Sequence, residues 1–196
     1  MIDSLISLDL YFFHLINNGA NESFLVAWMP LLREKWIWLP VYAFILSFVL
    51  RNFKLDSALF FIGFLFITIG TTDLVTSQIL KKEIKRLRPC AYEDVNLNLL
   101  VPCGSGYSMP SSHAANHFAL SLFLVFGFSG CSILIRMALI LWAVLISVAQ
   151  IFVGVHFPSD VIIGALVGGL MAWSLYQIYK RLIEPYYPMV HNISSS

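Results

Sequence analysis

Residues 57–80 read SALFFIGFLFITIGTTDLVTSQIL, an apolar run in which Asp73 is the only formally charged side chain. About 20 apolar residues suffice for a helix to cross the hydrocarbon core of a bilayer, so this run predicts a transmembrane helix. Four further apolar stretches occur along the chain: Trp36–Leu50, Ala114–Gly130, Cys131–Val155 and Val161–Tyr179. The pattern predicts an all-α, polytopic transmembrane helical bundle of five to six spans.

The composition of the whole chain also indicates a membrane protein. Of 196 residues, 59% are hydrophobic and 12% are charged, with a mean hydropathy of +0.80. Soluble domains carry about 25% charged residues, so the bilayer must be the solvent for much of this chain. The formal net charge is only +1. No bulk electrostatic attraction to nucleic acid follows from it, and nucleic acid is not expected as a partner.

The amino-terminal stretch differs from the five apolar runs. Ile2–Asn17 is apolar, but Asp3, Ser7 and His14 recur at roughly helical spacing. This pattern predicts a helix in the membrane interface, and a sixth span is the alternative. We therefore expect an amino-terminal interfacial segment over residues 1–35, a membrane domain over 36–183 and a tail over 184–196. The start of the chain lacks the basic residues of a cleavable signal.

The first polar cluster follows the second apolar run directly, where residues 81–89 read KKEIKRLRP. If the helix continues, Lys81, Lys85 and Arg88 share one face, and Pro89 ends the helix. Five cations within eight residues suit an anionic ligand. Taken alone, however, the cluster is better explained as a set of basic anchors at the level of the lipid headgroups.

The second cluster, at residues 109–113, reads MPSSH and precedes the third apolar run. Pro110, Ser111 and Ser112 predict a helix start, and the free N–H groups there form a ready phosphate site. The two serines add hydroxyl donors. His113 in the first turn is placed to give a proton to a leaving oxygen, whereas His117, one turn deeper, is predicted to be structural.

The third cluster lies between the last two apolar runs. His156 stands where one span ends, and Asp160 opens the next. A carboxylate this close can accept from one imidazole nitrogen, which fixes the tautomer and leaves the other nitrogen free to attack. Ionisable pairs at a membrane boundary are candidate functional sites.

Alternation of the spans places all three clusters on one side of the membrane, together with the single long loop Pro89–Pro110. The charges give a mixed orientation, because the cluster at 81–88 favours the cytoplasmic side unless it binds substrate. Cys90 and Cys103 bracket the loop, and a disulfide there would suit an oxidising compartment, with two free thiols as the alternative. We expect an inner or plasma membrane protein with an extracytoplasmic site. Cys131 is expected to be a small hydrophobic residue.

The three clusters, in this order, resemble the type-2 phosphatidic acid phosphatase superfamily of membrane lipid phosphatases. Lys81 through Arg88-Pro89 matches its first motif, a Lys, six residues and Arg-Pro. Residues 110–113 match Pro-Ser-Gly-His except that Ser112 replaces Gly. His156 and Asp160 match the third motif, but Gln150 stands where an Arg is expected. The resemblance covers residues 55–180.

The resemblance implies a catalytic role for each matched residue. His156 would attack phosphorus and carry a phosphohistidine, Asp160 would orient it, and His113 would protonate the leaving oxygen. Lys81, Arg88, Ser111, Ser112 and Gln150 would bind the phosphate of a lipid. No metal and no other cofactor is expected, since the Lys and Arg side chains would neutralise the charge of the phosphate. Because Gln150 offers one neutral donor where Arg offers two charged ones, Lys85 is predicted to compensate.

The favoured hypothesis is an enzyme that hydrolyses a polyprenyl diphosphate, a lipid A phosphate or a phosphatidylglycerol phosphate. A catalytically silent relative that binds or moves phospholipid is the second hypothesis, and the missing Arg is its main support. A channel or transporter is the third hypothesis. It would need polar residues lining a pore at mid-span, and the spans contain few. Asp73 is either a partner for a cation of the site or a hydrogen-bonded residue between helices. The sequence does not determine the oligomeric state.

Overall fold

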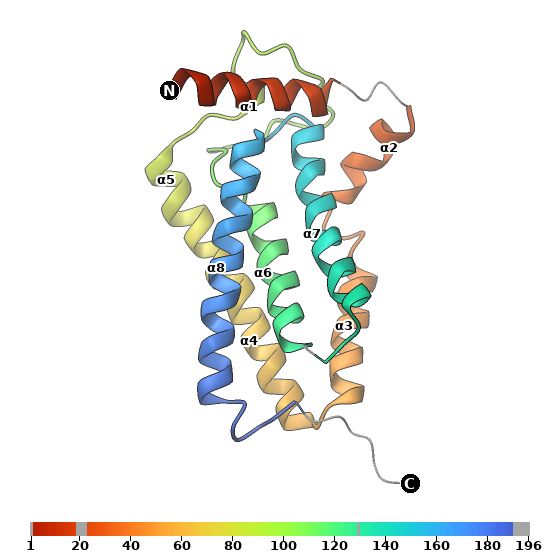
Figure 1. Cartoon of the computed structure of the whole chain (residues 1–196). Helices are drawn as coiled ribbons and strands as arrows, with labels where there is room; N and C mark the ends of the chain where they lie inside the picture. Colours follow the sequence, from red (N-terminus) through yellow and green to blue (C-terminus); the bar gives the residue numbers. More distant parts are fainter. Residues whose placement is uncertain (1, 19–22, 129, 190–196) are drawn as a thin grey trace.

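The computed structural model describes residues 2–18, 23–128 and 130–189, and its regular elements are helices. Five of them run side by side (Figure 1): α3 (Leu39–Asn52), α4 (Leu55–Leu74), α6 (Ser112–Gly127), α7 (Ile133–Phe152) and α8 (Pro158–Leu182). The α4 segment with its continuation, α7 and α8 are long and apolar enough to cross a membrane. The all-α transmembrane bundle is thus confirmed, while the number of spans stays a prediction.

The chain leaves α4 through an irregular helical segment that ends at the first polar cluster. A π-helical stretch, η1 (Val75–Leu80), leads into the short helix α5 (Lys81–Ile84). Such π-helical insertions are frequent at functional sites, because they change which side chains face the site. Here the insertion lies directly before Lys81.

The expected helical face of Lys81, Lys85 and Arg88 does not form. Helix α5 ends at Lys85, whose backbone is left-handed with φ 54°, and Arg88 is extended before the short 3₁₀ helix η2 (Pro89–Ala91). Pro89 disfavours a helical conformation in the residue before it, which explains the extended Arg88. Lys85 is exposed.

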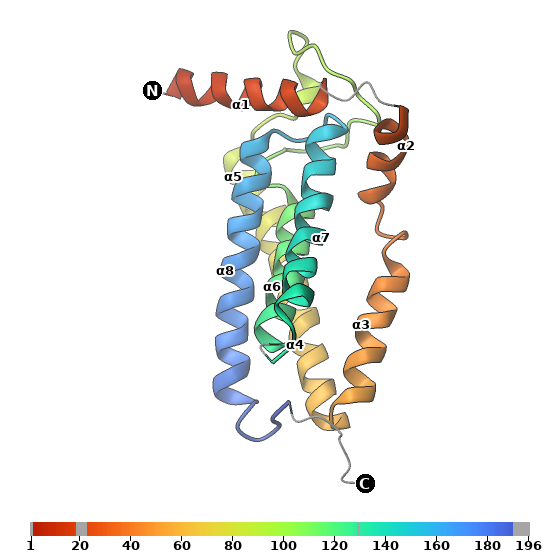
Figure 2. The same cartoon turned by 45° about the vertical axis from the view of Figure 1, so that its right-hand side comes forward.

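The amino-terminal segment holds two helices. Helix α1 (Ile2–Asn17) lies across one end of the bundle rather than along the spans (Figure 1), as an interfacial helix would. Helix α2 (Ser23–Leu32), which the sequence analysis did not predict, precedes α3 along the side of the bundle (Figure 2) and packs against α7. The Trp38 indole donates to the Leu32 carbonyl at 2.7 Å and so fixes the break between α2 and α3.

Helices α6 and α8 approach closely because α8 presents glycines to α6. A Cβ atom on Gly164 would lie 2.5 Å from the Ser111 carbonyl oxygen, and one on Gly168 would lie 2.1 Å from that of Ala115. This spacing of small residues is a known means of close packing between membrane helices. The Ser111 N–H donates to the Asp160 carbonyl at 2.9 Å. The starts of α6 and α8, which carry the second and third clusters, therefore meet.

An aromatic core fills the end of the bundle away from α1. Phe61 of α4 lies 5.2 Å from Phe123 of α6 and 5.7 Å from Tyr179 of α8, measured between ring centroids. All three side chains are buried. The core thus holds the far ends of the spans together, and the polar clusters occupy the end covered by α1.

Asp73 contacts a neighbouring helix. Its Oδ1 accepts from the Asn116 amide of α6 at 2.9 Å and from the Ser77 hydroxyl at 3.3 Å. Ser77 in turn lies 3.0 Å from the Ser112 hydroxyl. These contacts favour the second reading of Asp73, a hydrogen-bonded residue that links two helices, although its charge also acts on Lys81.

Candidate active site

His156 and Asp160 form the centre of the site, in the tight connection between α7 and α8. His156 Nδ1 lies 3.5 Å from Asp160 Oδ2, and both side chains are buried. The same Oδ2 accepts from the Phe157 N–H at 2.8 Å, so the carboxylate also caps α8. A carboxylate on the Nδ1 side favours the tautomer whose Nε2 lone pair is free. Burial lowers the pKa of His156 to about 4, although the neighbouring Asp160 carboxylate acts to raise it.

Arg88 lies at the other nitrogen of that imidazole. Its Nη1 donates to His156 Nε2 at 3.3 Å and to the Val155 carbonyl at 3.1 Å. An oxygen of a phosphoryl group held by this guanidinium would lie beside His156 Nε2. Two residues further on, Cys90 forms the disulfide with Cys103 that the sequence suggested. The disulfide closes the loop that follows Arg88.

The second cluster is a helix start, as predicted. Ser111 caps α6 by accepting from the Ala114 N–H at 3.4 Å, and it is completely buried. Ser112 and His113 are half-buried in the first turn. His113, Lys81 and His156 are close enough to act on one another electrostatically. The positive charges of Lys81 and Arg88 and the start of α6 therefore all lie near the His156 imidazole.

The side chain of Gln150 is buried in the last turn of α7. Neither its amide nitrogen nor its oxygen has a hydrogen-bond partner among the residues that the structure describes. An unpaired buried amide costs about 1–3 kcal/mol, which makes a missing partner at this position significant. The backbone carbonyl of Gln150 accepts from the Val155 N–H at 3.3 Å, so Gln150 lies against the chain that leads to His156.

Two charged residues of this region, Arg33 and Asp9, were not predicted as parts of the site, and a third, Arg86, makes contacts that were not predicted. Arg33, in the break between α2 and α3, acts electrostatically on both His113 and Arg88. Arg86 Nη1 donates to Asp160 Oδ1 at 2.7 Å, and its Nη2 pairs with Asp9 of α1 at 2.5 Å. Arg86 belongs to the basic cluster that the sequence identified. Nothing in the sequence linked Arg33 or Asp9 to the site.

Two other residues of the sequence analysis have clear places. His117 Nδ1 lies 2.9 Å from the His113 carbonyl, and its Nε2 lies 3.2 Å from the Tyr42 hydroxyl. This is the structural role predicted for it. In the described ranges, no three His, Cys, Asp or Glu residues gather as they would around a metal ion.

The fold and the site together define an integral membrane phosphatase. The sequence profile of the PAP2 superfamily matches residues 58–184, which is most of the chain, and the chain belongs to this superfamily. It is 33% identical over 189 residues to the lipid A 4'-phosphatase of Bacteroides thetaiotaomicron, covering 93% of this chain and 81% of that protein. It is 28% identical over 181 residues to the undecaprenyl-diphosphatase of Sulfolobus acidocaldarius, covering 88% and 79%.

Two solved structures share the fold. The crystal structure of Aquifex aeolicus LpxE matches with a TM-score of 0.66 and 28% identity, over 87% of this chain and 95% of that one. The PAP2-type phosphatidylglycerolphosphate phosphatase of Bacillus subtilis matches with a TM-score of 0.69 and 22% identity, over 91% and 88%. The chain is thus a PAP2-type lipid phosphatase, a hydrolase.

Proposed function

We propose that this protein hydrolyses a phosphate monoester of a lipid A-type glycolipid through a phosphohistidine intermediate. The observation that carries the reaction is the buried His156–Asp160 pair with Arg88 at the imidazole Nε2. The substrate class is supported by the similarity to a lipid A 4'-phosphatase along nearly the whole chain.

The proposed reaction has two steps. His156 Nε2 attacks phosphorus, the P–O bond to the lipid breaks, and His113 protonates the departing oxygen. A water molecule, deprotonated by His113, then attacks the phosphohistidine, the N–P bond breaks, and inorganic phosphate leaves. Asp160 stabilises the positive charge that develops on the imidazole, and its 3.5 Å contact is expected to shorten as that charge forms.

Donors around the site neutralise the phosphoryl oxygens. Arg88 and Lys81 supply positive charge, and the first turn of α6 supplies N–H groups together with Ser112. Ser111 supports this turn as its cap, with its hydroxyl as a further donor. Gln150, buried and without a partner in the described parts of the chain, supplies a neutral amide. We propose Arg33 as the additional cation in place of Lys85, because Lys85 is exposed and Arg33 acts on both Arg88 and His113.

An apolar groove near the site would take a lipid chain. It encloses about 510 Å³ between α3, α4 and α6. Its wall includes His117, one turn below His113, and Lys35, Tyr42 and Asn116 supply further polar groups. The apolar part of the lining suits an acyl chain, and consists of Leu39, Ile45, Leu46, Leu65, Phe66, Ile69 and Leu120.

We also propose that the site faces the extracytoplasmic side. The Cys90–Cys103 disulfide lies at the active end, and disulfides persist in oxidising compartments. The opposite ends of the helices carry Arg51, Lys54, Lys180 and Arg181. Basic residues favour the cytoplasmic side. The active end carries more of them, counting the five at residues 81–88, so the proposed orientation rests on the disulfide.

A substrate panel with purified protein tests the proposal. Phosphate release is measured from lipid A bisphosphate, undecaprenyl diphosphate and phosphatidylglycerol phosphate, with and without EDTA. We expect lipid A to be preferred and EDTA to have no effect. His156→Ala should abolish turnover, and Asp160→Asn should lower it severely while leaving a folded protein. Preference for undecaprenyl diphosphate would contradict the proposed lipid A-type substrate. Wild-type activity in His156→Ala would exclude the phosphohistidine mechanism.

A further inference from the structure

Helix α1 presents one buried face to the active end of the bundle. Asp9, Phe13 and Asn17 follow one another at intervals of four residues, so they share this face. Phe13 and Asn17 are buried, and Asp9 is half-buried. Each contacts a different part of the molecule, so α1 is docked by specific contacts rather than by apolar surface alone.

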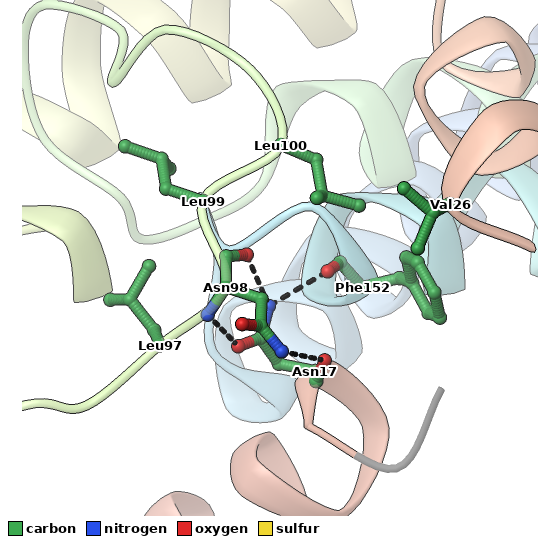
Figure 3. Close-up of a pocket in the computed structure, with 7 residues that line it drawn as sticks. All are labelled: Asn17, Val26, Leu97, Asn98, Leu99, Leu100 and Phe152. Carbon is green, nitrogen blue, oxygen red and sulfur yellow. Dashed lines mark hydrogen bonds between the residues drawn. The ribbon is translucent and has the colours of Figure 1, made fainter. Parts of the chain in front are cut away.

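The end of α1 is fixed by Asn17 (Figure 3). Its amide nitrogen donates to the carbonyls of Asn98 at 2.9 Å and Phe152 at 2.7 Å, and its oxygen accepts from the Asn98 N–H at 2.8 Å. In the middle of the helix, the Phe13 ring packs 5.4 Å from that of Phe157, the neighbour of His156. These two contacts hold α1 across the end of α7 and beside the site.

Asp9 makes the contact that reaches the catalytic carboxylate. Its Oδ1 accepts from the Ser159 N–H at 2.9 Å, and its Oδ2 accepts from the Ser159 hydroxyl at 2.6 Å and from Arg86 Nη2 at 2.5 Å. The other end of the same guanidinium, Nη1, donates to Asp160 Oδ1 at 2.7 Å. Arg86 thus bridges a carboxylate of α1 and the carboxylate that faces His156.

The bridge fixes the geometry of Asp160. Arg86 holds Oδ1 and the Phe157 N–H holds Oδ2, so rotation of the carboxylate is blocked and Oδ2 stays towards His156. The Arg86 guanidinium also lies 4.1 Å from the Phe157 ring centroid, which fixes its own position. A planar guanidinium suits this double contact better than an ammonium group would.

The bridge also sets the charge near His156. Arg86 alone would neutralise much of the negative charge on Asp160, which the imidazole needs as it becomes cationic. Asp9 shares the same guanidinium, so that two carboxylates divide one positive charge. The other charged or titratable groups that face His156 are Arg88, Lys81 and His113. The group formed by Asp9, Arg86 and Asp160 therefore keeps a net negative charge beside His156.

We infer that Asp9 and Arg86 are positioning residues for the reaction, through which α1 holds and tunes the catalytic carboxylate. The inference rests on the proposed phosphohistidine mechanism. It makes the amino-terminal helix part of the catalytic apparatus, acting through Asp160 without contact with the substrate.

The test compares Asp9→Asn, Arg86→Gln and the double variant with the wild type. Each single variant is expected to lower kcat on the order of tenfold with little change in KM, because the substrate contacts remain. The acid limb of the pH–rate profile should move in opposite directions. Asp9→Asn removes a negative charge and shifts it to lower pH, whereas Arg86→Gln removes a positive charge and shifts it to higher pH. The double variant restores the charge balance, and its acid limb should return towards that of the wild type.

Two controls separate positioning from simple docking. Asn17→Ala weakens the other anchor of α1 and should leave the pH profile unchanged. Asp94→Asn removes an exposed charge from the nearby loop and should also leave it unchanged. Arg86→Lys should restore part of the kcat lost in Arg86→Gln. Wild-type kcat and profile in Asp9→Asn, or the same shift in Asn17→Ala, would overturn the inference. Failure of the proposed function is seen separately, as wild-type protein without phosphatase activity or His156→Ala with it.

Discussion

At the scale of single residues, the pKa of His156 determines the pH range in which the proposed nucleophile is available. Burial lowers this pKa to about 4, from an ordinary value of 6.5, so the imidazole stays neutral in mildly acidic solution. Because only the neutral form attacks, activity governed by His156 should be lost as the pH falls through about 4, not through 6.5.

The measurement is kcat/KM against pH for a lipid monophosphate and a lipid diphosphate. An acid limb due to the enzyme is the same for both substrates, whereas one due to ionisation of the substrate moves between them. A shared limb with its midpoint near the ordinary histidine value would contradict this prediction.

Arg33 and Lys85 provide a second comparison between single residues. Arg33 is half-buried, its Nε has no partner among the described residues, and its charge acts on Arg88 and His113. Arg33→Gln is therefore expected to lower kcat/KM on the order of tenfold or more, about 1.4 kcal/mol.

Lys85→Gln is the matched control, because this exposed side chain should be close to neutral. Gln150→Arg should partly restore activity to Arg33→Gln, and a double-mutant cycle measures the coupling. A large loss in Lys85→Gln with a neutral Arg33→Gln would reverse the assignment of the compensating cation.

At the scale of the helices, the contact between α6 and α8 decides whether the clusters meet. A Cβ atom on Gly168 would lie 2.1 Å from the Ala115 carbonyl oxygen, which is backbone and cannot move aside as a side chain could. Gly168→Ala should therefore push the helices apart and destabilise the protein by roughly 1–3 kcal/mol. Activity should fall as well, because the starts of both helices carry the site.

Gly63→Ala in α4 is the control for this substitution. Nothing lies within 4 Å of a Cβ atom there, so the higher helix propensity of Ala should leave stability unchanged or raise it. Thermal denaturation in detergent compares the two variants. Equal stability of Gly168→Ala and Gly63→Ala would show that the close approach is not required.

At the scale of the whole molecule, the three cysteines report its orientation. Cys90 and Cys103 form a disulfide at the active end, and Cys131 is a half-buried free thiol in the turn between α6 and α7, at the other end. In intact cells, a membrane-impermeant maleimide should label Cys90 and Cys103 only after mild reduction. Cys131 should stay unlabelled until the membrane is permeabilised. Labelling of Cys131 alone from outside would place the site on the cytoplasmic side.

The broad architecture was predictable because it depends on local chemistry. Long apolar runs must form helices in a bilayer, since only a helix satisfies its own backbone there. The predicted runs Ala114–Gly130, Cys131–Val155 and Val161–Tyr179 correspond to α6, α7 and α8 with shifts of a few residues at their ends. His156 and Asp160 were identifiable as candidates because they are four residues apart at the junction of two spans, and Ser111 because helix caps have a local signature.

The remaining features were decided by contacts between distant parts of the chain. The sequence pattern predicted a helix that continues to Arg88. Pro89 and the contacts of Arg86 interrupt that helix, so Arg88 reaches His156 from an extended segment. Asp9 contacts Ser159 across 150 positions, and Arg86 contacts Asp160 across 74. The sequence by itself determined the membrane helices and the chemical groups available at their ends. Only the tertiary structure determined which charges meet there, because paired charges are selected by distance in space, which no local pattern records.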